Sequence, residues 1–201
     1  MSLLAAIKNM LYVFEGPRNS GKTHFSKMVS NRFKIQRFQF SFAEYFKRLG
    51  MQSQNSREAH SFALGKELMI MQLVKDFHTG FEDDPLSFIH DRGILSVLAW
   101  GLVEKRISES EMEIQIKLLK DINLLDKVKI ILVTGKNPST EKRNKDQWDE
   151  LDGDLREMDC YEKVISCLER HNIGSIWKIQ NNFDPQSETS MIELFEHILF
   201  D

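Results

Sequence analysis

The chain has 201 residues, of which 41% are hydrophobic and 28% are charged, and its formal net charge is −3. This composition is ordinary for a soluble globular protein, and it excludes collagen, a low-complexity tail and a small disulfide-stapled scaffold. No window approaches the ~18–20 uninterrupted apolar residues of a membrane span, and the opening apolar stretch is too short for a secretory signal, so we expect one soluble domain, residues 1–201, in the cytoplasm.

Hydrophobic periodicity predicts strands that alternate with helices, with no repeat and no linker. The predicted strands cover residues 11–14, 35–40, 86–90, 128–133 and 175–179. The predicted helices cover residues 22–33, 42–49, 57–77, a stretch up to about 104, 108–124, about 155–171 and the end of the chain from about 188. Ser108 and Glu111 have capping-box spacing, and the apolar run 128–133 is typical of a strand buried on both faces of a parallel sheet. The order predicts a three-layer α/β fold with a mainly parallel sheet of about five strands.

Residues 16–23 read G-P-R-N-S-G-K-T and match the phosphate-loop pattern G-x-x-x-x-G-K-[ST] in full. The glycines of such a loop let backbone N–H groups face a phosphate, and the following helix N-terminus adds positive potential. The lysine would reach the β- and γ-phosphates of ATP, and the threonine hydroxyl would ligate Mg²⁺. The match lies between a predicted strand and a predicted helix, which is the context that this motif requires. We expect the nucleotide to be bound by Gly16, Arg18, Asn19, Ser20, Gly21, Lys22, Thr23 and His24.

The charge of the chain is unevenly spread around this motif. Residues 1–57 hold ten Lys and Arg against two acids, a net +8, so the remainder carries −11. A basic segment on an acidic body favours a small polyanion as ligand over a general nucleic-acid track, although solvated surface lysines and arginines would give the same count.

The two cysteines, Cys160 and Cys167, are too far apart along a helix to bridge, so we expect buried thiols in a reducing compartment.

Asp91 and Arg92 follow the third predicted strand directly. In a parallel sheet this position lies beside the phosphate loop, at the edge where ligands gather. Asp91 could hold Mg²⁺ directly or through water, and Arg92 could grip a transferring or accepting phosphoryl group. The alternative is a strand-end salt bridge or a helix cap. We favour the functional interpretation because the phosphate loop is present.

The polar segment 135–154 is a predicted lid. Lys136, Lys142, Arg143 and Lys145 come first, and seven acids follow within residues 146–159. A basic loop after a buried strand can close over a nucleotide and supply a cation to the reaction. Arg143 is the favoured catalytic residue, because a guanidinium can bridge two phosphate oxygens. The alternative is an exposed helix end with many salt bridges.

Together these motifs resemble the thymidylate kinase and deoxynucleoside kinase superfamily over most of the chain. Residues 14–16 (FEG) with the loop resemble the family's opening, and residues 62–66 (FALGK) resemble its Phe-Ala-Ala-Asp-Arg segment. Residues 91–100 (DRGILSVLAW) resemble Asp-Arg-aromatic-x-x-Ser-x-x-Ala-Tyr. The resemblance implies a P-loop kinase with ATP and Mg²⁺ as cofactors. It also implies that the acceptor contacts Phe62, Lys66, Arg92 and Ser96.

The chain departs from that family pattern on the acceptor side. Arg18 stands where thymidylate kinases carry the aspartate that touches the acceptor sugar, and Gly101 stands where they carry a glutamine. No Arg-Glu-Pro follows the second predicted strand, which leaves Glu44 as the nearest acceptor-side carboxylate. These departures argue against thymidine monophosphate as the acceptor, but not against phosphoryl transfer. They would suit an enzyme encoded by a bacteriophage.

The leading hypothesis is an ATP- and Mg²⁺-dependent kinase of a (deoxy)nucleoside monophosphate, because cations are abundant and acids scarce near the motifs. A deoxynucleoside kinase is the alternative, with Glu44 as the base for a 5′-hydroxyl. A kinase of a hydroxyl on a polynucleotide or on a modified base in DNA, and a non-catalytic nucleotide-binding module, also stay open. The expected partner is a small nucleotide or nucleoside; a homodimer is compatible with the sequence, nucleic acid is not favoured, and no membrane contact is expected.

Overall fold

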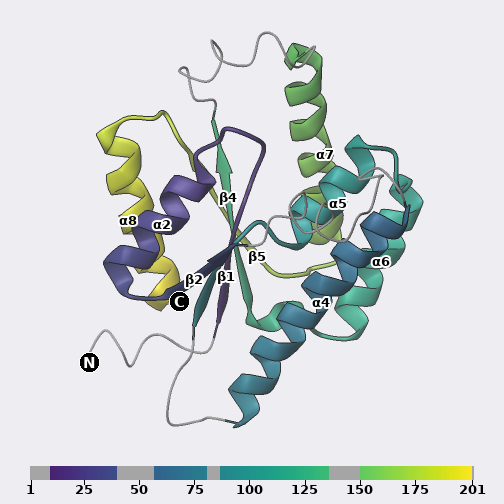
Figure 1. The fold of residues 1–201 in the computed structure, drawn as a ribbon, viewed down its shortest axis with the longest axis horizontal. Helices are drawn as coiled ribbons and strands as arrows, with labels where there is room; N and C mark the ends of the chain where they lie inside the picture. Colours follow the sequence, from purple (N-terminus) through teal and green to yellow (C-terminus); the bar gives the residue numbers. More distant parts are fainter. Residues whose placement is uncertain (1–9, 40–56, 81–86, 136–149, 201) are drawn as a thin grey trace.

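The computed structural model describes residues 10–39, 57–80, 87–135 and 150–200 (Figure 1). The strands of this part are β1 Leu11–Glu15, β2 Gln36–Gln39, β3 Phe88–Asp91, β4 Val128–Thr134 and β5 Ser175–Gln180. Its α-helices are α2 Lys22–Phe33, α4 Arg57–Gly80, α5 Ile94–Val103, α6 Glu109–Asp121, α7 Glu150–Arg170 and α8 Pro185–Phe200. A 3₁₀ turn at Leu125–Lys127 leads into β4.

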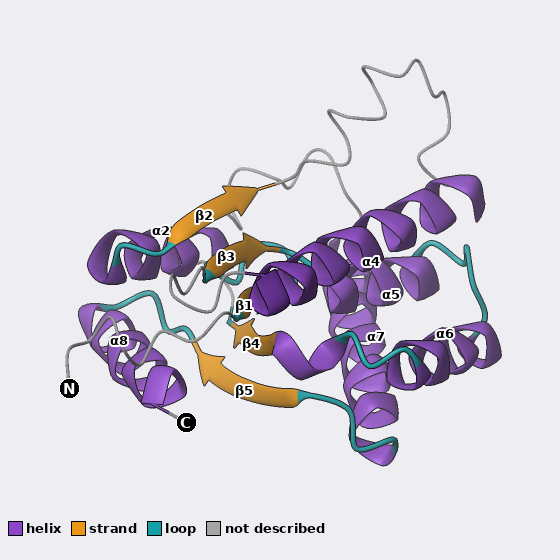
Figure 2. Ribbon diagram, turned by 90° about the horizontal axis from the view of Figure 1, so that it is seen from below, coloured by secondary structure: helices purple, strands orange, loops and turns teal. Residues whose placement is uncertain are grey.

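The five strands form one sheet in the order β2-β3-β1-β4-β5, and every neighbouring pair is parallel. Helices α2 and α8 cover one face of the sheet, and α4, α5, α6 and α7 cover the other (Figures 1 and 2). This three-layer arrangement confirms the predicted α/β fold with a five-stranded parallel sheet. Within the described segments, no helix is both long and apolar enough to cross a membrane.

Alternation of side chains along the central strands builds two cores. Leu11 and Val13 of β1 pack with α4, α5, α6 and α7, whereas Tyr12 and Phe14 pack with α2 and α8, chiefly against Phe195. Strand β4 is likewise buried on both faces, as its nearly unbroken apolar run predicted. The carboxyl ends of β1 and β3 therefore emerge between two packed layers, and the phosphate loop begins there.

Most predicted elements are present, with shifted ends. The last helix begins at Pro185 and not at residue 188, because proline suits a first helical position and the Asp184 carboxylate accepts the Ser187 N–H at 2.7 Å. Helix α7 begins at Glu150, inside the segment predicted to be a lid, and α4 continues to Gly80. The capping box of Ser108 and Glu111 is confirmed. The predicted helix 42–49 lies outside the described residues.

Candidate functional site

Two glycines shape the loop between β1 and α2, because the backbone there adopts left-handed conformations. Gly16 has φ 139° and Gly21 has φ 89°. A Cβ at Gly16 would lie 2.1 Å from the Val133 carbonyl oxygen, and one at Gly21 would lie 2.1 Å from Asn181 Nδ2. Any side chain would therefore clash at either position. The loop follows a buried strand and opens α2, as the motif requires.

Asn181, just after β5, fixes the far end of this loop. Its side chain is buried, with Nδ2 donating to the Ser20 carbonyl oxygen at 2.9 Å and Oδ1 accepting the Phe183 N–H at 2.8 Å. Its backbone N–H donates to the Thr134 carbonyl oxygen at 2.7 Å. Sequence reasoning missed this residue, which follows the last strand as Asp91 follows the third. It ties the phosphate loop to the ends of β4 and β5.

Lys22 is the buried cation of the loop. Only 4% of the residue is exposed, and Nζ donates to the Pro17 carbonyl oxygen at 2.7 Å. The pKa of Lys22 is lowered to about 7, first because burial disfavours its charged form and next because Arg92 is close. Thr23, one residue on, is half-buried in the first turn of α2. Lysine and hydroxyl thus both lie at the helix N-terminus.

Asp91 ends β3 as a buried carboxylate held from one side. Its Oδ2 lies 2.7 Å from Arg37 Nη2, and Arg37 Nε donates to Ser26 Oγ at 2.8 Å. Its Oδ1 is buried and has no hydrogen-bond partner among the described residues. The next residue, Arg92, has φ 72° and donates its backbone N–H to the Phe14 carbonyl oxygen. A left-handed conformation is uncommon for arginine and is concentrated at functional positions.

Glu15 is a buried cap on the N-terminus of α5. Its carboxylate accepts the N–H groups of Gly93, Leu95 and Ser96 at 2.9, 3.0 and 3.2 Å, and also the Ser96 hydroxyl. Ser96 Oγ lies 2.7 Å from the hydroxyl of Tyr161 on α7. Burial raises the pKa of Glu15, and these hydrogen bonds oppose the shift. Ser96, predicted to contact an acceptor, lies in this buried network.

Glu157 of α7 reaches the loop from the opposite layer. It is buried, and both carboxylate oxygens lie 3.2 Å from the backbone N of Arg18. Burial raises the pKa of Glu157, and Arg92, Arg18 and Lys22 oppose the shift. The Arg18 guanidinium lies over the Trp100 ring of α5, with Cζ 4.1 Å from the ring centroid. Sequence reasoning missed Glu157, because it is 139 residues from the backbone group that it contacts.

A second charged group lies on α4. Lys66 Nζ is 2.5 Å from Glu67 Oε1, and Glu67 Oε2 is 3.3 Å from Nε2 of His90 on β3. All three side chains are buried. Phe62, one turn earlier on α4, is 40% exposed. The predicted acceptor residue Lys66 is therefore already in contact with a carboxylate.

The structure brings four of the predicted residues together, namely Arg18, Lys22, Asp91 and Arg92. Lys22 interacts electrostatically with Asp91, Arg92 and Glu157, and Glu157 also interacts with Arg18. His24 lies elsewhere, on the exposed side of α2, where it pairs with Glu188 of α8 at 2.7 Å. Glu44, Arg143 and residues 136–149 of the predicted lid lie outside the described residues. Within the described segments no group of three or more His, Cys, Asp or Glu could hold a metal by itself.

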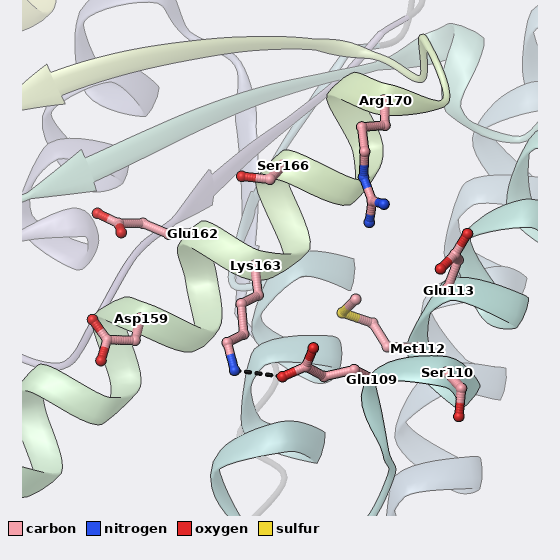
Figure 3. A pocket seen from close by; sticks show the side chains of 9 residues that line it. All are labelled: Glu109, Ser110, Met112, Glu113, Asp159, Glu162, Lys163, Ser166 and Arg170. Atoms are coloured by element: carbon pink, nitrogen blue, oxygen red, sulfur yellow. Dashed lines mark hydrogen bonds and ion pairs between the residues drawn. The ribbon is translucent and has the colours of Figure 1, made fainter.

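A surface hollow lies between α6 and α7, away from the loop (Figure 3). The Lys163 ammonium and the Glu109 carboxylate pair across it. The remaining lining residues are Ser110, Met112, Glu113, Asp159, Glu162, Ser166 and Arg170. None of them belongs to the predicted site, so this hollow is separate from the phosphate loop.

No protein-family model matches the chain, and no curated protein matches it. Solved structures do. A deoxyadenosine kinase from M. mycoides with dCMP and dCDP bound superposes with a TM-score of 0.58 at 16% identity, covering 94% of this chain and 98% of that one. A thymidylate kinase from Ehrlichia chaffeensis gives 0.60 at 15% identity, covering 94% and 98%. A thymidylate kinase from Candida albicans gives 0.57 at 14% identity, covering 96% and 94%. The chain therefore has the fold of these P-loop kinases, as its motifs predicted.

Proposed function

We propose that this protein is an ATP- and Mg²⁺-dependent kinase that transfers the γ-phosphoryl group of ATP to a (deoxy)nucleoside monophosphate. The observation that carries the proposal is the phosphate loop, with buried Lys22 next to Asp91 and Arg92 at the carboxyl edge of a parallel sheet. The structural neighbours, a deoxyadenosine kinase and two thymidylate kinases, support the same reaction class.

The donor side of the reaction uses the loop itself. The backbone N–H groups and the N-terminus of α2 bind the phosphates of ATP. Lys22 Nζ exchanges the Pro17 carbonyl oxygen for phosphate oxygens, which favour its charged form. Its positive charge then stabilises the negative charge that develops on the leaving oxygen during transfer. Asn181 keeps the loop in the required shape from the β5 side.

Thr23 and Asp91 are the residues that would hold Mg²⁺. The fit rests on Asp91, whose Oδ1 is a buried acceptor without a hydrogen-bond partner among the described residues, while Arg37 fixes Oδ2. Hydroxyl and carboxylate oxygens are the ligands that Mg²⁺ prefers, together with substrate phosphates and water. When bound, the ion would neutralise charge on the β- and γ-phosphates.

The acceptor side favours a phosphate as the nucleophile. A phosphate monoester is ionised at neutral pH, because its second pKa is about 6, so no base is needed. One of its oxygens forms a bond to the γ-phosphorus, the bond to the β,γ-bridging oxygen breaks, and ADP leaves with the electron pair. Arg18 and Arg92 supply the cations that this acceptor requires. Arg143 is our candidate for a further cation from the lid.

One observation favours a deoxynucleoside as the alternative acceptor. A hydroxyl must lose its proton on attack, and Glu157 is a buried carboxylate close to Lys22. Burial that raises the pKa of this carboxyl also makes it a better base. In that case Glu157 would take the role first assigned to Glu44.

Transfer of label from γ-³²P-ATP tests the function. Nucleoside monophosphates, nucleosides and DNA are offered in parallel, with and without Mg²⁺, and Lys22→Ala is the control. We expect label on monophosphates, and a loss on the order of 10²-fold in kcat for Lys22→Ala. Label only on nucleosides selects the alternative, and label on DNA selects a polynucleotide kinase. Binding of ATP without any acceptor-dependent transfer would leave a non-catalytic nucleotide-binding module.

We also propose that two copies associate. Neighbouring helices α4 and α6, joined by the Arg57–Glu111 and His60–Gln115 contacts, expose large apolar side chains. These are Phe62, Met69, Leu73, Ile114, Leu118 and Ile122. An apolar surface that meets itself across a two-fold axis is buried on both copies.

A further inference from the structure

Arg37 connects the two residues proposed to hold Mg²⁺, although it belongs to the element of neither. It lies on β2, the strand at one edge of the sheet. Its Nη2 donates to Asp91 Oδ2 at 2.7 Å, and its Nε donates to Ser26 Oγ at 2.8 Å. The Ser26 hydroxyl in turn donates to the Thr23 carbonyl oxygen at 3.0 Å. Hydrogen bonds through Arg37 and Ser26 therefore join the end of β3 to the first turn of α2.

The strand register places Arg37 and Asp91 on the same face of the sheet. Arg37 is opposite Ile89 in the parallel pairing of β2 with β3, and Asp91 is two residues further along β3. Side chains two residues apart on a strand share a face, and Ile89 lies in the same core as Phe25 of α2. The side chains of Asp91 and Arg37 are 1% and 14% exposed, and Ser26 is buried. These charge-assisted hydrogen bonds are thus shielded from water, a setting that strengthens them.

The contacts of Arg37 fix the orientation of the Asp91 carboxylate. A planar guanidinium held at two atoms cannot turn, so Oδ2 is held as well. Oδ1 is buried and has no hydrogen-bond partner among the described residues. Mg²⁺ requires nearly ideal octahedral geometry, and a carboxylate that offers one oxygen in a fixed orientation suits it better than one that can rotate. The arginine therefore prepares Asp91 for the ion from the side that the ion does not use.

We propose that Arg37 is a positioning residue for the metal-binding carboxylate of Asp91, and that Ser26 supports it by tying the same guanidinium to the backbone of Thr23. This inference rests on the proposed Mg²⁺-dependent function and adds to it residues that act through the metal ligands. Loss of a group that hydrogen-bonds to a metal ligand costs roughly 10- to 100-fold in metal affinity. We expect about tenfold for Arg37, the lower end of that range, because the phosphates of the nucleotide also bind the ion.

Mn²⁺ titrations followed by electron paramagnetic resonance test this role without turnover. The protein is saturated with a non-hydrolysable ATP analogue, and the parent is compared with Arg37→Ala, Arg37→Lys and Ser26→Ala. For Arg37→Ala the affinity for Mn²⁺ should fall about tenfold, whereas the affinity for the analogue in EDTA should be unchanged. Arg37→Lys should recover little, because an ammonium lacks the planar fork that reaches both partners. Ser26→Ala should show part of the loss. Arg32→Ala removes the same charge from the exposed end of α2 and is the matched control.

Two further measurements separate positioning from a purely structural role. In the double variant Arg37→Ala/Ser26→Ala, the loss of Mn²⁺ affinity should be smaller than the product of the two single losses, since Ser26 acts through Arg37. In steady-state kinetics, the Mg²⁺ concentration for half-maximal activity of Arg37→Ala should rise about tenfold, while kcat at saturating Mg²⁺ changes little.

Unchanged Mn²⁺ affinity in Arg37→Ala, with only a lower melting temperature, would make the Arg37–Asp91 pair structural and overturn the inference while the proposed kinase stands. An equal loss of analogue affinity in EDTA would assign Arg37 to the nucleotide, which also overturns it. Failure of the parent protein to bind Mn²⁺ with the analogue would instead refute the proposed Mg²⁺-dependent function. If Arg37→Ala does not fold, Arg37→Lys and Ser26→Ala decide the question, and parent-like Mn²⁺ affinity in both refutes the inference.

Discussion

The protonation of Lys22 depends on which group its side-chain nitrogen contacts. Burial in the loop disfavours the charged form of Lys22, and its ammonium donates a hydrogen bond to the carbonyl oxygen of Pro17. A polyphosphate replaces that acceptor with several negative oxygens. The lysine pKa must then rise, because an opposite charge nearby favours the protonated form.

Nucleotide binding should therefore take up protons above neutral pH. With a pKa of about 7, Lys22 is mostly neutral at pH 8 in the free protein, and ATP recharges it. Uptake should be close to one proton at pH 8 and should fall toward zero at pH 6, where Lys22 is already charged. Titration calorimetry in buffers of different ionisation enthalpy measures this uptake. Lys22→Met should abolish its pH dependence; an unchanged profile in that variant would assign the proton to another group.

Glu15 and Ser96 give a prediction about stability. Glu15→Ala removes the acceptor of three buried N–H groups and one hydroxyl, and we expect unfolding to become easier by roughly 2–4 kcal/mol. Ser96→Ala removes one hydroxyl from the same network and should cost about 1 kcal/mol. Urea denaturation measures both losses. Because Ser96 Oγ is held by Glu15 and Tyr161, we expect Ser96→Ala to leave the acceptor KM unchanged. A rise in that KM would instead support the acceptor role that the resemblance implies.

At the scale of elements, the segment that follows β5 controls the donor half of the site. Asn181→Ala removes the side-chain hydrogen bond to the Ser20 carbonyl oxygen and leaves the loop end free to move. We expect the KM of ATP to rise about tenfold, the cost of losing one buried hydrogen bond, with the acceptor KM unchanged. Asn182→Ala is the matched control, because residue 182 is exposed and its backbone N–H binds Ser187 Oγ. Equal effects of the two variants would show that Asn181 does not support the loop.

The elements that sequence reasoning predicted well are those set by short-range chemistry. The loop and α2 were predicted residue by residue, because glycine positions and a helix start within eight residues determine them. Arg37, Glu157 and Asn181 were missed, because each contact spans a large sequence separation: 54 residues from Arg37 to Asp91, 139 from Arg18 to Glu157 and 161 from Ser20 to Asn181. One signal for Arg37 was present. It shares a strand face with buried Ile35, so a charged side chain at that position required a buried partner.

For the whole molecule, the exposed apolar surface of α4 and α6 leads to a prediction about assembly. Met69 and Leu73 are 58% and 49% exposed, and Ile114 and Leu118 are 65% and 50% exposed. We expect a homodimer at micromolar concentration in light scattering coupled to gel filtration. Leu73→Lys combined with Leu118→Lys should give a monomer, because like charges would then face each other without solvent. Lys27→Glu on exposed α2 should leave the mass unchanged. A monomeric parent protein would disprove the dimer.

The phosphate loop is fastened at two points, to α7 through Arg18 and to the end of β5 through Asn181. A ligand that stabilises one of these two contacts also restricts the motion of the backbone at the other, since only two residues separate Arg18 from Gly21. Donor and acceptor would then bind cooperatively, without direct contact between their remote parts. Thermodynamic linkage makes this coupling reciprocal: any factor by which the acceptor improves ATP affinity is the factor by which ATP improves acceptor affinity. An eight-residue loop would in this way make simultaneous occupancy of the donor and acceptor sites more probable than independent binding would.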